Sequence, residues 1–199
     1  MSSKSIKQLF EKSIELKKSV LQSNADEHIF QMAQTISNSI KSGGKLLICG
    51  NGGSAADAQH LAAELVVRLR PNVNRLALPA ISLALDSSFL TACGNDFSFD
   101  DIFLRSLEAL ASSDDVLLGI STSGNSENVR RALTRAKELK LKTCAFLGGT
   151  GGNTKGLADF EYIVPSAETG RIQEVHIMLG HALMETIEDN LLISMGQPS

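Results

Sequence analysis

The sequence predicts an α/β fold in which helices flank a five-stranded parallel sheet. Five short apolar runs alternate with longer segments in which apolar residues recur at helical spacing. Two of these runs end in loops rich in glycine and hydroxyl residues, and a helix is predicted directly after each loop. Ligands of such folds lie beyond the carboxyl ends of the strands, so we expect the two loops to share one binding site.

The composition is that of a single globular domain. With 199 residues, of which 43% are hydrophobic and 21% charged, the chain can form one sizeable core, and it shows no repeat or linker. We therefore assign 1–199 to one domain, with a helical pair at 1–43 and an α/β core at 44–199. The formal net charge of −3 and the lack of a Lys or Arg cluster predict no binding of nucleic acid.

The cysteines and the hydropathy pattern indicate the compartment. Cys49, Cys93 and Cys144 lie far apart without CxxC spacing, so we expect reduced core residues and no disulfide or zinc-finger framework. The N-terminus is polar, and no run of about 18 apolar residues occurs. These features predict a cytoplasmic protein that does not bind a membrane.

Two helices are predicted before the first strand. Residues 4–22 carry apolar side chains at helical intervals, and Asn24 can cap a second helix that ends at Gly43 and Gly44. The pair either covers one edge of the sheet or serves in association between subunits, and the sequence does not favour one alternative over the other.

The first loop follows a strand predicted at Lys45–Cys49. It reads Gly50-Asn51-Gly52-Gly53-Ser54, and Ser54 stands at the start of the next helix, where the backbone N–H groups and the helix dipole favour a phosphate. Gly50, Gly52 and Ala55 also match a loose dinucleotide fingerprint. The acidic residue expected about 20 residues later is missing, as is the lysine of a P-loop. A compact phosphoester therefore fits this loop better than a nucleotide.

The helix after this loop has one polar face, opposite its leucines. The face is formed at spacings of three, four and four by Asp57, His60, Glu64 and Arg68. On spacing alone a solvated surface is the favoured interpretation, because charge stripes are common on exposed helices. The position of the stripe, one to three turns beyond a phosphate loop, favours a functional site instead.

The next segment has a strand predicted at Ala80–Leu85 and a short helix that begins at Asp86-Ser87-Ser88. Gly94-Asn95-Asp96-Phe97 is typical of a turn, in which Asn95 and Asp96 could cap, bend or bind; residue type alone favours the turn. A further helix is predicted over Ile102–Ala111.

The second loop follows a buried strand predicted at Val116–Ile120 and precedes a helix over Glu127–Leu139. Its sequence, Ser121-Thr122-Ser123-Gly124-Asn125-Ser126, places four hydroxyls at a turn from strand to helix, which suits the oxygens of a phosphate. The alternative is helix capping by Asn125 or Ser126. We favour binding because this loop is predicted at the same sheet edge as the first.

Two more strands and a long helix complete the chain. The strands are predicted at Thr143–Leu147 and Glu161–Val164, and the helix at Ile172–Ile193. Gly148-Gly149-Thr150-Gly151-Gly152, between the strands, is more typical of a flexible turn than of a third phosphate loop.

Three motifs in this order resemble the sugar isomerase (SIS) family, and within it the phosphoheptose isomerases. They are Gly50-Asn51-Gly52-Gly53-Ser54, the loop Ser121 to Ser126, and Arg171-Ile172-Gln173-Glu174 with His176 and His181. The resemblance implies interconversion of sedoheptulose 7-phosphate and D-glycero-D-manno-heptose 7-phosphate, a precursor of ADP-heptose and the heptose of lipopolysaccharide. It also implies a homotetramer with active sites between subunits.

The resemblance also implies the residues of the site. The implied substrate contacts are Asn51, Gly52, Gly53, Ser54, Glu64, Asn95, Asp96, Ser121, Thr122, Ser123, Ser126 and Gln173. The implied ligands of one zinc ion per subunit are His60, Glu64, Gln173 and His181. Spacing alone supports His60 and Glu64 as a pair of metal ligands, because they lie at i and i+4 on one helical face. On the last helix, however, spacing would pair His181 as a ligand with Glu174 rather than with Gln173.

The expected mechanism is an aldose-ketose isomerisation through an enediol, with Glu64 as the base and His181 as the acid. Without the motif, His181 would be interpreted as a core histidine among Leu179, Leu183 and Met184. A related family member, the DnaA initiator-associating protein, is an adaptor without the catalytic carboxylate, whereas this chain keeps Glu64 and His181. An adaptor is therefore the rival function, and an isomerase of another phosphorylated sugar is a third.

Overall fold

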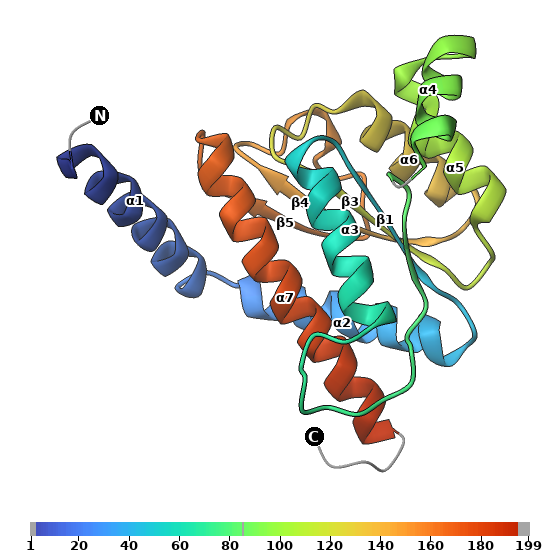
Figure 1. The fold of residues 1–199 in the computed structure, drawn as a ribbon, viewed down its shortest axis with the longest axis horizontal. Helices are drawn as coiled ribbons and strands as arrows, with labels where there is room; N and C mark the ends of the chain where they lie inside the picture. The colour runs from blue at the N-terminus through green and yellow to red at the C-terminus, as the bar shows by residue number, and fades with distance from the viewer. Residues whose placement is uncertain (1–2, 85, 195–199) are drawn as a thin grey trace.

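The computed structural model describes residues 3–84 and 86–194, and it contains a five-stranded sheet in which every strand is parallel to its neighbours (Figure 1). The strands are β1 (Leu46–Gly50), β2 (Ala80–Ser82), β3 (Val116–Ser121), β4 (Lys142–Gly148) and β5 (Phe160–Val164). Their order is β2-β1-β3-β4-β5, so the direction of winding reverses between β1 and β3. Open α/β sheets bind ligands at this reversal, and both predicted loops leave the sheet there.

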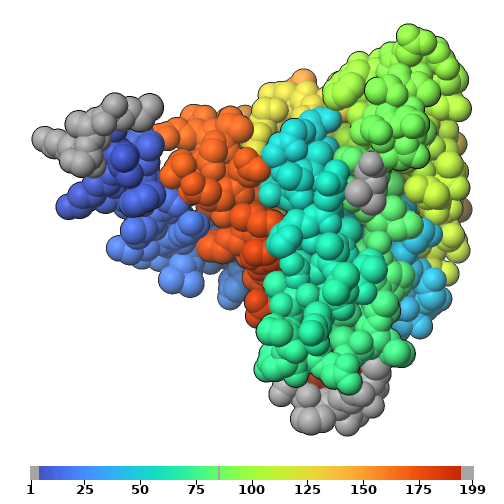
Figure 2. Space-filling model, viewed as in Figure 1, coloured from blue at the N-terminus to red at the C-terminus, as the bar shows by residue number. Residues whose placement is uncertain are grey.

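Helices cover both faces of the sheet, as predicted. One core cluster joins the strands to α2 (Ala25–Lys41), α3 (Gly53–Val66) and α7 (Thr169–Ser194). The other joins them to α4 (Ser87–Asp96), α5 (Ile102–Leu110) and α6 (Glu127–Glu138). Short 3₁₀ turns lie at Phe99–Asp101 and Gly152–Thr154. The first helix, α1 (Ser3–Leu21), stands at one end of the molecule beside α7 (Figure 2).

The central strands are buried along their whole length. Every residue of β1 and of β3 is buried, and Leu46, Leu47 and Ile48 are fully inaccessible to solvent. Burying one such side chain contributes about 1.5–3 kcal/mol. The ends of β1 and β3 are thereby fixed, and so are the starting points of the two loops.

Several sequence-based boundaries need correction. The turn predicted at 94–97 is wrong, because α4 continues through Asp96; the Asp86 side chain caps its start by accepting from the N–H groups of Ser88 and Phe89. The second strand ends at Ser82, and Leu85, which was predicted within it, lies outside the described residues. Asn24 precedes α2 without a capping bond from its side chain, which contacts His28 instead.

The cysteines have the buried, unpaired character that the sequence predicts. Cys49, Cys93 and Cys144 are free and buried, and burial raises the pKa of Cys49 to about 12 and that of Cys144 further. Both thiols therefore stay protonated at neutral pH, as expected of core residues. Within the described ranges, no helix combines the length and apolar character needed to cross a bilayer.

Candidate active site

The two predicted loops lie side by side because β1 and β3 are paired neighbours, with Gly50 opposite Ile120. A pair of reciprocal hydrogen bonds joins their ends. The Asn51 amide donates to Asn128 Oδ1 over 2.8 Å, and the Asn128 amide donates to Asn51 Oδ1 over 2.9 Å. Asn128 is only 1% exposed, so this amide pair fixes the first loop against the start of α6.

The first loop needs its glycines for conformation and space. Gly52 has φ +56, in the left-handed region where a side chain is strained, and a Cβ on Gly50 would overlap the backbone of Ser54. Ser54 is buried near the start of α3, as predicted. Its N–H donates to the Asn51 carbonyl and closes the turn, so this N–H is engaged within the loop. A phosphate would have to use other donors of the turn or the Ser54 hydroxyl.

Internal hydrogen bonds order the second loop. The Ser121 hydroxyl is buried; it donates to Ser126 Oγ over 3.0 Å and accepts the Gly124 N–H over 3.1 Å. The exposed Ser123 accepts the N–H of Asn125. Ser126 precedes α6 without making a side-chain cap, so plain helix capping does not explain its hydroxyl.

The glycine-rich segment after β4 supports this second loop. The Asn153 N–H donates to Asn125 Oδ1, and the Thr154 N–H donates to the Gly124 carbonyl. A Cβ on Gly124 would overlap the carbonyl of Gly151, which explains the small residues at this contact. The segment thus holds the second loop in place through backbone hydrogen bonds, a role that its sequence did not indicate.

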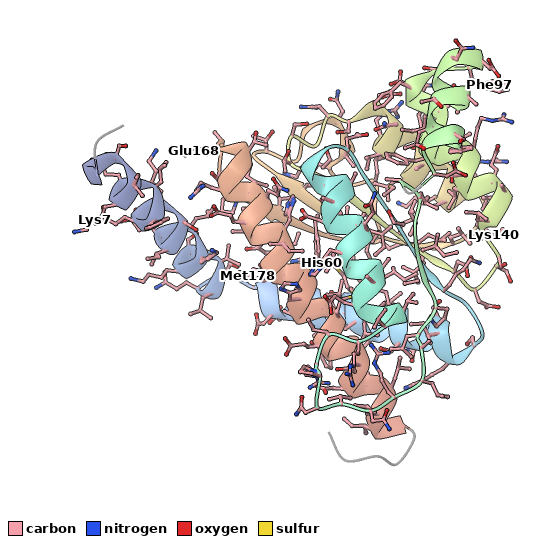
Figure 3. All side chains as sticks on the ribbon, in the orientation of Figure 1. Lys7, His60, Phe97, Lys140, Glu168 and Met178 are labelled. Atoms are coloured by element: carbon pink, nitrogen blue, oxygen red, sulfur yellow. The ribbon has the colours of Figure 1, made fainter. Side chains whose placement is uncertain are left out.

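A second group of predicted residues meets where α3 packs against α7, which we call the α3–α7 seam. His60 Nε2 lies 2.9 Å from His181 Nε2 and 3.3 Å from Glu64 Oε1 (Figure 3 labels His60). The helices approach closely because Gly180 on α7 leaves room for Leu61 on α3. His60 and His181 are 121 residues apart in the chain, and this packing alone brings them together.

The three side chains of the seam present more electron pairs than protons. An imidazole nitrogen has one in-plane position, which holds either a proton or a lone pair. His60 Nε2 therefore cannot satisfy both the Glu64 carboxylate and His181 Nε2 when both rings are neutral. A cation among the three would accept these electron pairs, and imidazole and carboxylate are ligands that zinc prefers. The donor types of His60, Glu64 and His181 thus suit a zinc ion, although the three side chains are not arranged around one point in the described residues.

Gln173 lies at the other end of the seam. A Cβ on Gly53 would overlap its side-chain amide, so Gln173 packs against the first turn of α3. It also hydrogen-bonds Asp57, which is 7% exposed and has one carboxylate oxygen without a partner. Burial raises the pKa of Asp57, whereas Gln173 and the imidazoles of His60 and His181 act in the opposite direction. Asp57 therefore belongs to the seam and not to a solvated face.

The remaining predicted residues lie outside these contacts. Arg68 follows the end of α3 and is exposed, so it does not continue the polar stripe. Asn95 and Asp96 are exposed at the end of α4, where the Asn95 amide donates to Asp96. Across residues 3–84 and 86–194, no three His, Cys, Asp or Glu side chains are already arranged to hold a metal. Gln173 and His181 are eight residues apart, about 12 Å of helix rise, so a shared ion would require both side chains to lean inward.

His176 of the third motif has a structural position. It is 1% exposed, its Nε2 lies 3.0 Å from the Leu147 carbonyl, and its ring stacks on Phe146. Burial lowers the pKa of His176 to about 4, while the bond to Leu147 acts in the opposite direction. The ring is therefore neutral at physiological pH and joins α7 to β4.

The chain is similar to known proteins over most of its length. The model of the SIS domain matches residues 8–148. A phosphoheptose isomerase of Pelodictyon phaeoclathratiforme is 52% identical over 177 residues, which cover 88% of this chain and 83% of the relative. The solved phosphoheptose isomerase of Neisseria gonorrhoeae is 40% identical and superposes with a TM-score of 0.86, covering 92% of this chain and 98% of that one. The solved phosphoheptose isomerase of Francisella tularensis is 37% identical and superposes with a TM-score of 0.89, covering 95% of this chain and 100% of that one.

Proposed function

Because this chain belongs to the SIS domain family and, within it, to the phosphoheptose isomerases, we propose that it interconverts sedoheptulose 7-phosphate and D-glycero-D-manno-heptose 7-phosphate through an enediol. The observation that carries the proposal is the convergence of Glu64, His60 and His181 in one seam, beside two ordered loops that suit a phosphate. The related proteins named above are isomerases, which favours an enzyme over an adaptor.

Glu64 is the proposed base. Moving a proton between C1 and C2 of a ketose requires a base at carbon and an acid near the oxygens. The side chain of Glu64 is 15% exposed, so it is partly shielded from water yet accessible to a substrate in the seam. Its carboxylate can accept the proton from one carbon and return it to the other.

His181 is the proposed acid, and His60 is its partner. The two Nε2 atoms are 2.9 Å apart, so a proton held by one ring can be shared with the other. Histidine is a common general acid in enzymes, which suits proton exchange with the sugar oxygens. The position of His181 supports this role over that of a core histidine, because its Nε2 lies beside His60 Nε2 across the seam.

The two loops supply the proposed phosphate contacts. Hydroxyl groups lie at the same edge of the sheet, from Ser54, Ser121, Thr122, Ser123 and Ser126. The backbone N–H groups of Asn51 to Gly53 lie at this edge as well. Hydrogen bonds from neutral donors to an anion are stronger than those between neutral groups. Asn95 and Asp96 remain predicted sugar contacts.

A zinc ion in the seam would be held by His60, Glu64 and His181, with Gln173 as the fourth predicted ligand. When bound, zinc would polarise the sugar carbonyl and stabilise negative charge on the enediol oxygens. Glu64 would then divide its two oxygens between the ion and the proton.

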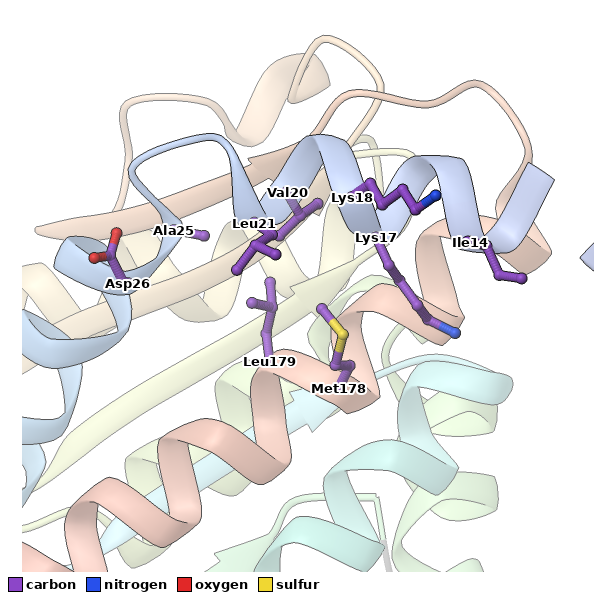
Figure 4. A pocket seen from close by; sticks show the side chains of 9 residues that line it. All are labelled: Ile14, Lys17, Lys18, Val20, Leu21, Ala25, Asp26, Met178 and Leu179. Atoms are coloured by element: carbon purple, nitrogen blue, oxygen red, sulfur yellow. The ribbon is translucent and has the colours of Figure 1, made fainter. Parts of the chain in front are cut away.

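We also propose a homotetramer. Apolar side chains of α1 are exposed, among them Phe10 (64%) and Leu21 (84%). An apolar groove of about 510 Å³ lies between α1, the start of α2 and α7 (Figure 4). It is lined in part by Ile14, Val20, Met178 and Leu179. A second copy could cover this surface, and sedimentation showing an active monomer at micromolar concentration would contradict the assembly.

One assay tests the function directly. Purified protein is incubated with sedoheptulose 7-phosphate, and formation of the aldose is followed over time. We expect turnover, which a non-catalytic adaptor would not show. Fructose 6-phosphate, a shorter ketose phosphate, serves as the comparison; preferred turnover of that sugar would assign the chain to a different isomerase specificity.

A further inference from the structure

The long crossover between α3 and β2 inserts one buried arginine beneath the seam. This segment, residues 67–79, follows the end of α3 and passes alongside α7 (Figure 1). Within it, the side chain of Arg75 is 4% exposed, whereas neighbouring Leu76 is 77% exposed. The chain therefore turns a guanidinium inward and a leucine outward, the opposite of the usual preference.

Arg75 caps the end of α3. Its Nη2 donates to the Glu64 carbonyl and its Nη1 to the Leu65 carbonyl, each over 2.8 Å. The last carbonyls of a helix lack partners within the helix and carry its negative dipole end, so a buried cation is favourable there. One of the two capped residues is Glu64 itself, the proposed base.

The same guanidinium is bound to α7. Arg75 Nε donates to Glu188 Oε1 over 2.5 Å, and the Glu188 side chain is 1% exposed. Glu188 lies seven residues after His181, about two helical turns or 10 Å further along α7. Arg75 thus joins the backbone of Glu64 to the helix that carries His181.

A second arginine provides an internal comparison. Arg70 also binds Glu188, through Oε2, and it binds Asp189 as well, yet its described hydrogen bonds reach no carbonyl of α3. Arg70 is also more exposed than Arg75, at 25% against 4% for the side chain. Both arginines neutralise the same buried carboxylate, but of the two only Arg75 has side-chain hydrogen bonds described to both α3 and α7.

We propose that Arg75 and Glu188 are positioning residues for isomerisation, which fix the place of Glu64 relative to His181. This inference rests on the proposed function, in which those two side chains act on one substrate. Catalytic groups must be held within about 0.5 Å of their working geometry, and a displacement of about 1 Å can cost roughly 100-fold in rate. The α3–α7 contact at Gly180 and Leu61 is a close apolar contact, and Arg75 adds a polar connection between the same two helices.

Arg75→Lys is the central test variant. Lysine keeps a charge for Glu188 but cannot span two carbonyls and a carboxylate, because it lacks the planar fork of arginine. We expect kcat to fall at least about tenfold, with KM for sedoheptulose 7-phosphate within about twofold, since the phosphate loops lie elsewhere. Arg70→Lys, the matched control, should keep kcat within about twofold. Circular dichroism at the assay temperature verifies that both variants are folded.

A readout independent of turnover separates this proposal from the proposed function. The imidazole nitrogen signals of His60 and His181, assigned with His60→Gln and His181→Gln, are compared by NMR among the wild type, Arg75→Lys and Arg70→Lys. We expect shifted signals in Arg75→Lys alone. Unmoved signals, or equal effects of the two lysine variants on kcat, would overturn the positioning role. A wild type without turnover but with the expected NMR shifts would overturn only the reaction.

Discussion

The two proposed phosphate loops and the α3–α7 seam are built in different ways from different parts of the chain. Each loop is formed by a strand, a turn and a helix that follow one another in sequence, and its order comes from short hydrogen bonds such as Ser121 to Ser126. The seam joins His60 to His181 across 121 residues and depends on how two helices pack. Neutral donors dominate the loops, whereas titratable side chains dominate the seam.

This difference teaches where binding and chemistry can be altered separately. Loop variants should change KM for a phosphorylated sugar, because the loops hold the proposed phosphate contacts and lack a proposed base or acid. Seam variants should change kcat, because they alter the groups that move protons. Any variant that breaks this division would show that the two regions act as one site.

The largest expected effect comes from Glu64→Gln. The amide keeps the size of the side chain but cannot act as a base, so kcat should fall at least about 100-fold while the fold persists and phosphosugar binding remains. Glu174→Gln is the matched control on α7, since Glu174 binds Ser13 and Arg171 outside the seam. Near-normal turnover of Glu64→Gln would remove the proposed mechanism.

Metal removal should produce the next largest effect. Protein treated with a chelator should lose most of its turnover and recover it with added zinc, because the electron pairs of His60, Glu64 and His181 would again have an acceptor. Zinc should also raise the melting temperature of the wild type, and less so that of His60→Gln, because a ligand that binds only the folded state stabilises it. Full activity in EDTA together with zinc-free protein would contradict the metal site.

Much of the fold and part of the site were predictable from the sequence for local reasons. The alternation of apolar runs and helical segments predicted the five parallel strands, and β1, β3, β4 and β5 begin and end within one residue of their expected bounds. Glycine and serine directly after β1 and β3 marked the two loops. These features are encoded by neighbouring residues, so periodicity and turn chemistry identify them.

What could not be predicted depends on distant contacts. Asn128 looked like an ordinary residue in the first turn of a helix, yet it joins the two loops. Asp57 was compatible with a solvated stripe, although α7 covers it, and no local pattern marked Arg75 for a buried contact. Gly94 to Asp96 was misassigned for a local reason, because these residues extend α4 beyond the start that Asp86 caps. Tertiary packing determines the other three roles.

Gly53→Ala tests the boundary between the two regions. The added Cβ would overlap the Gln173 amide and displace it from Asp57, so kcat should fall about tenfold. Alanine is about 1 kcal/mol more favourable than glycine in a helix, which should limit the loss of stability. Gly94→Ala on α4 is the control, because a Cβ there meets nothing within 4 Å. Equal activity of both variants would show that the position of Gln173 is not critical.

The smallest expected effects distinguish two serines of the same loop. Ser123 is exposed, so Ser123→Ala should remove one proposed hydrogen bond to the phosphate. The loss of a hydrogen bond to a charged group, worth about 1.5 kcal/mol, should raise KM roughly tenfold. We expect kcat and the melting temperature to stay unchanged. Ser121 is buried between Ser126 and Gly124, so Ser121→Ala should raise KM and also lower stability by about 1 kcal/mol. Ser113→Ala, between α5 and β3 at the opposite end of the sheet, should change neither quantity. An unchanged KM in both loop variants would place the phosphate elsewhere, and a fall in kcat would show that the loop reaches the chemistry of the seam.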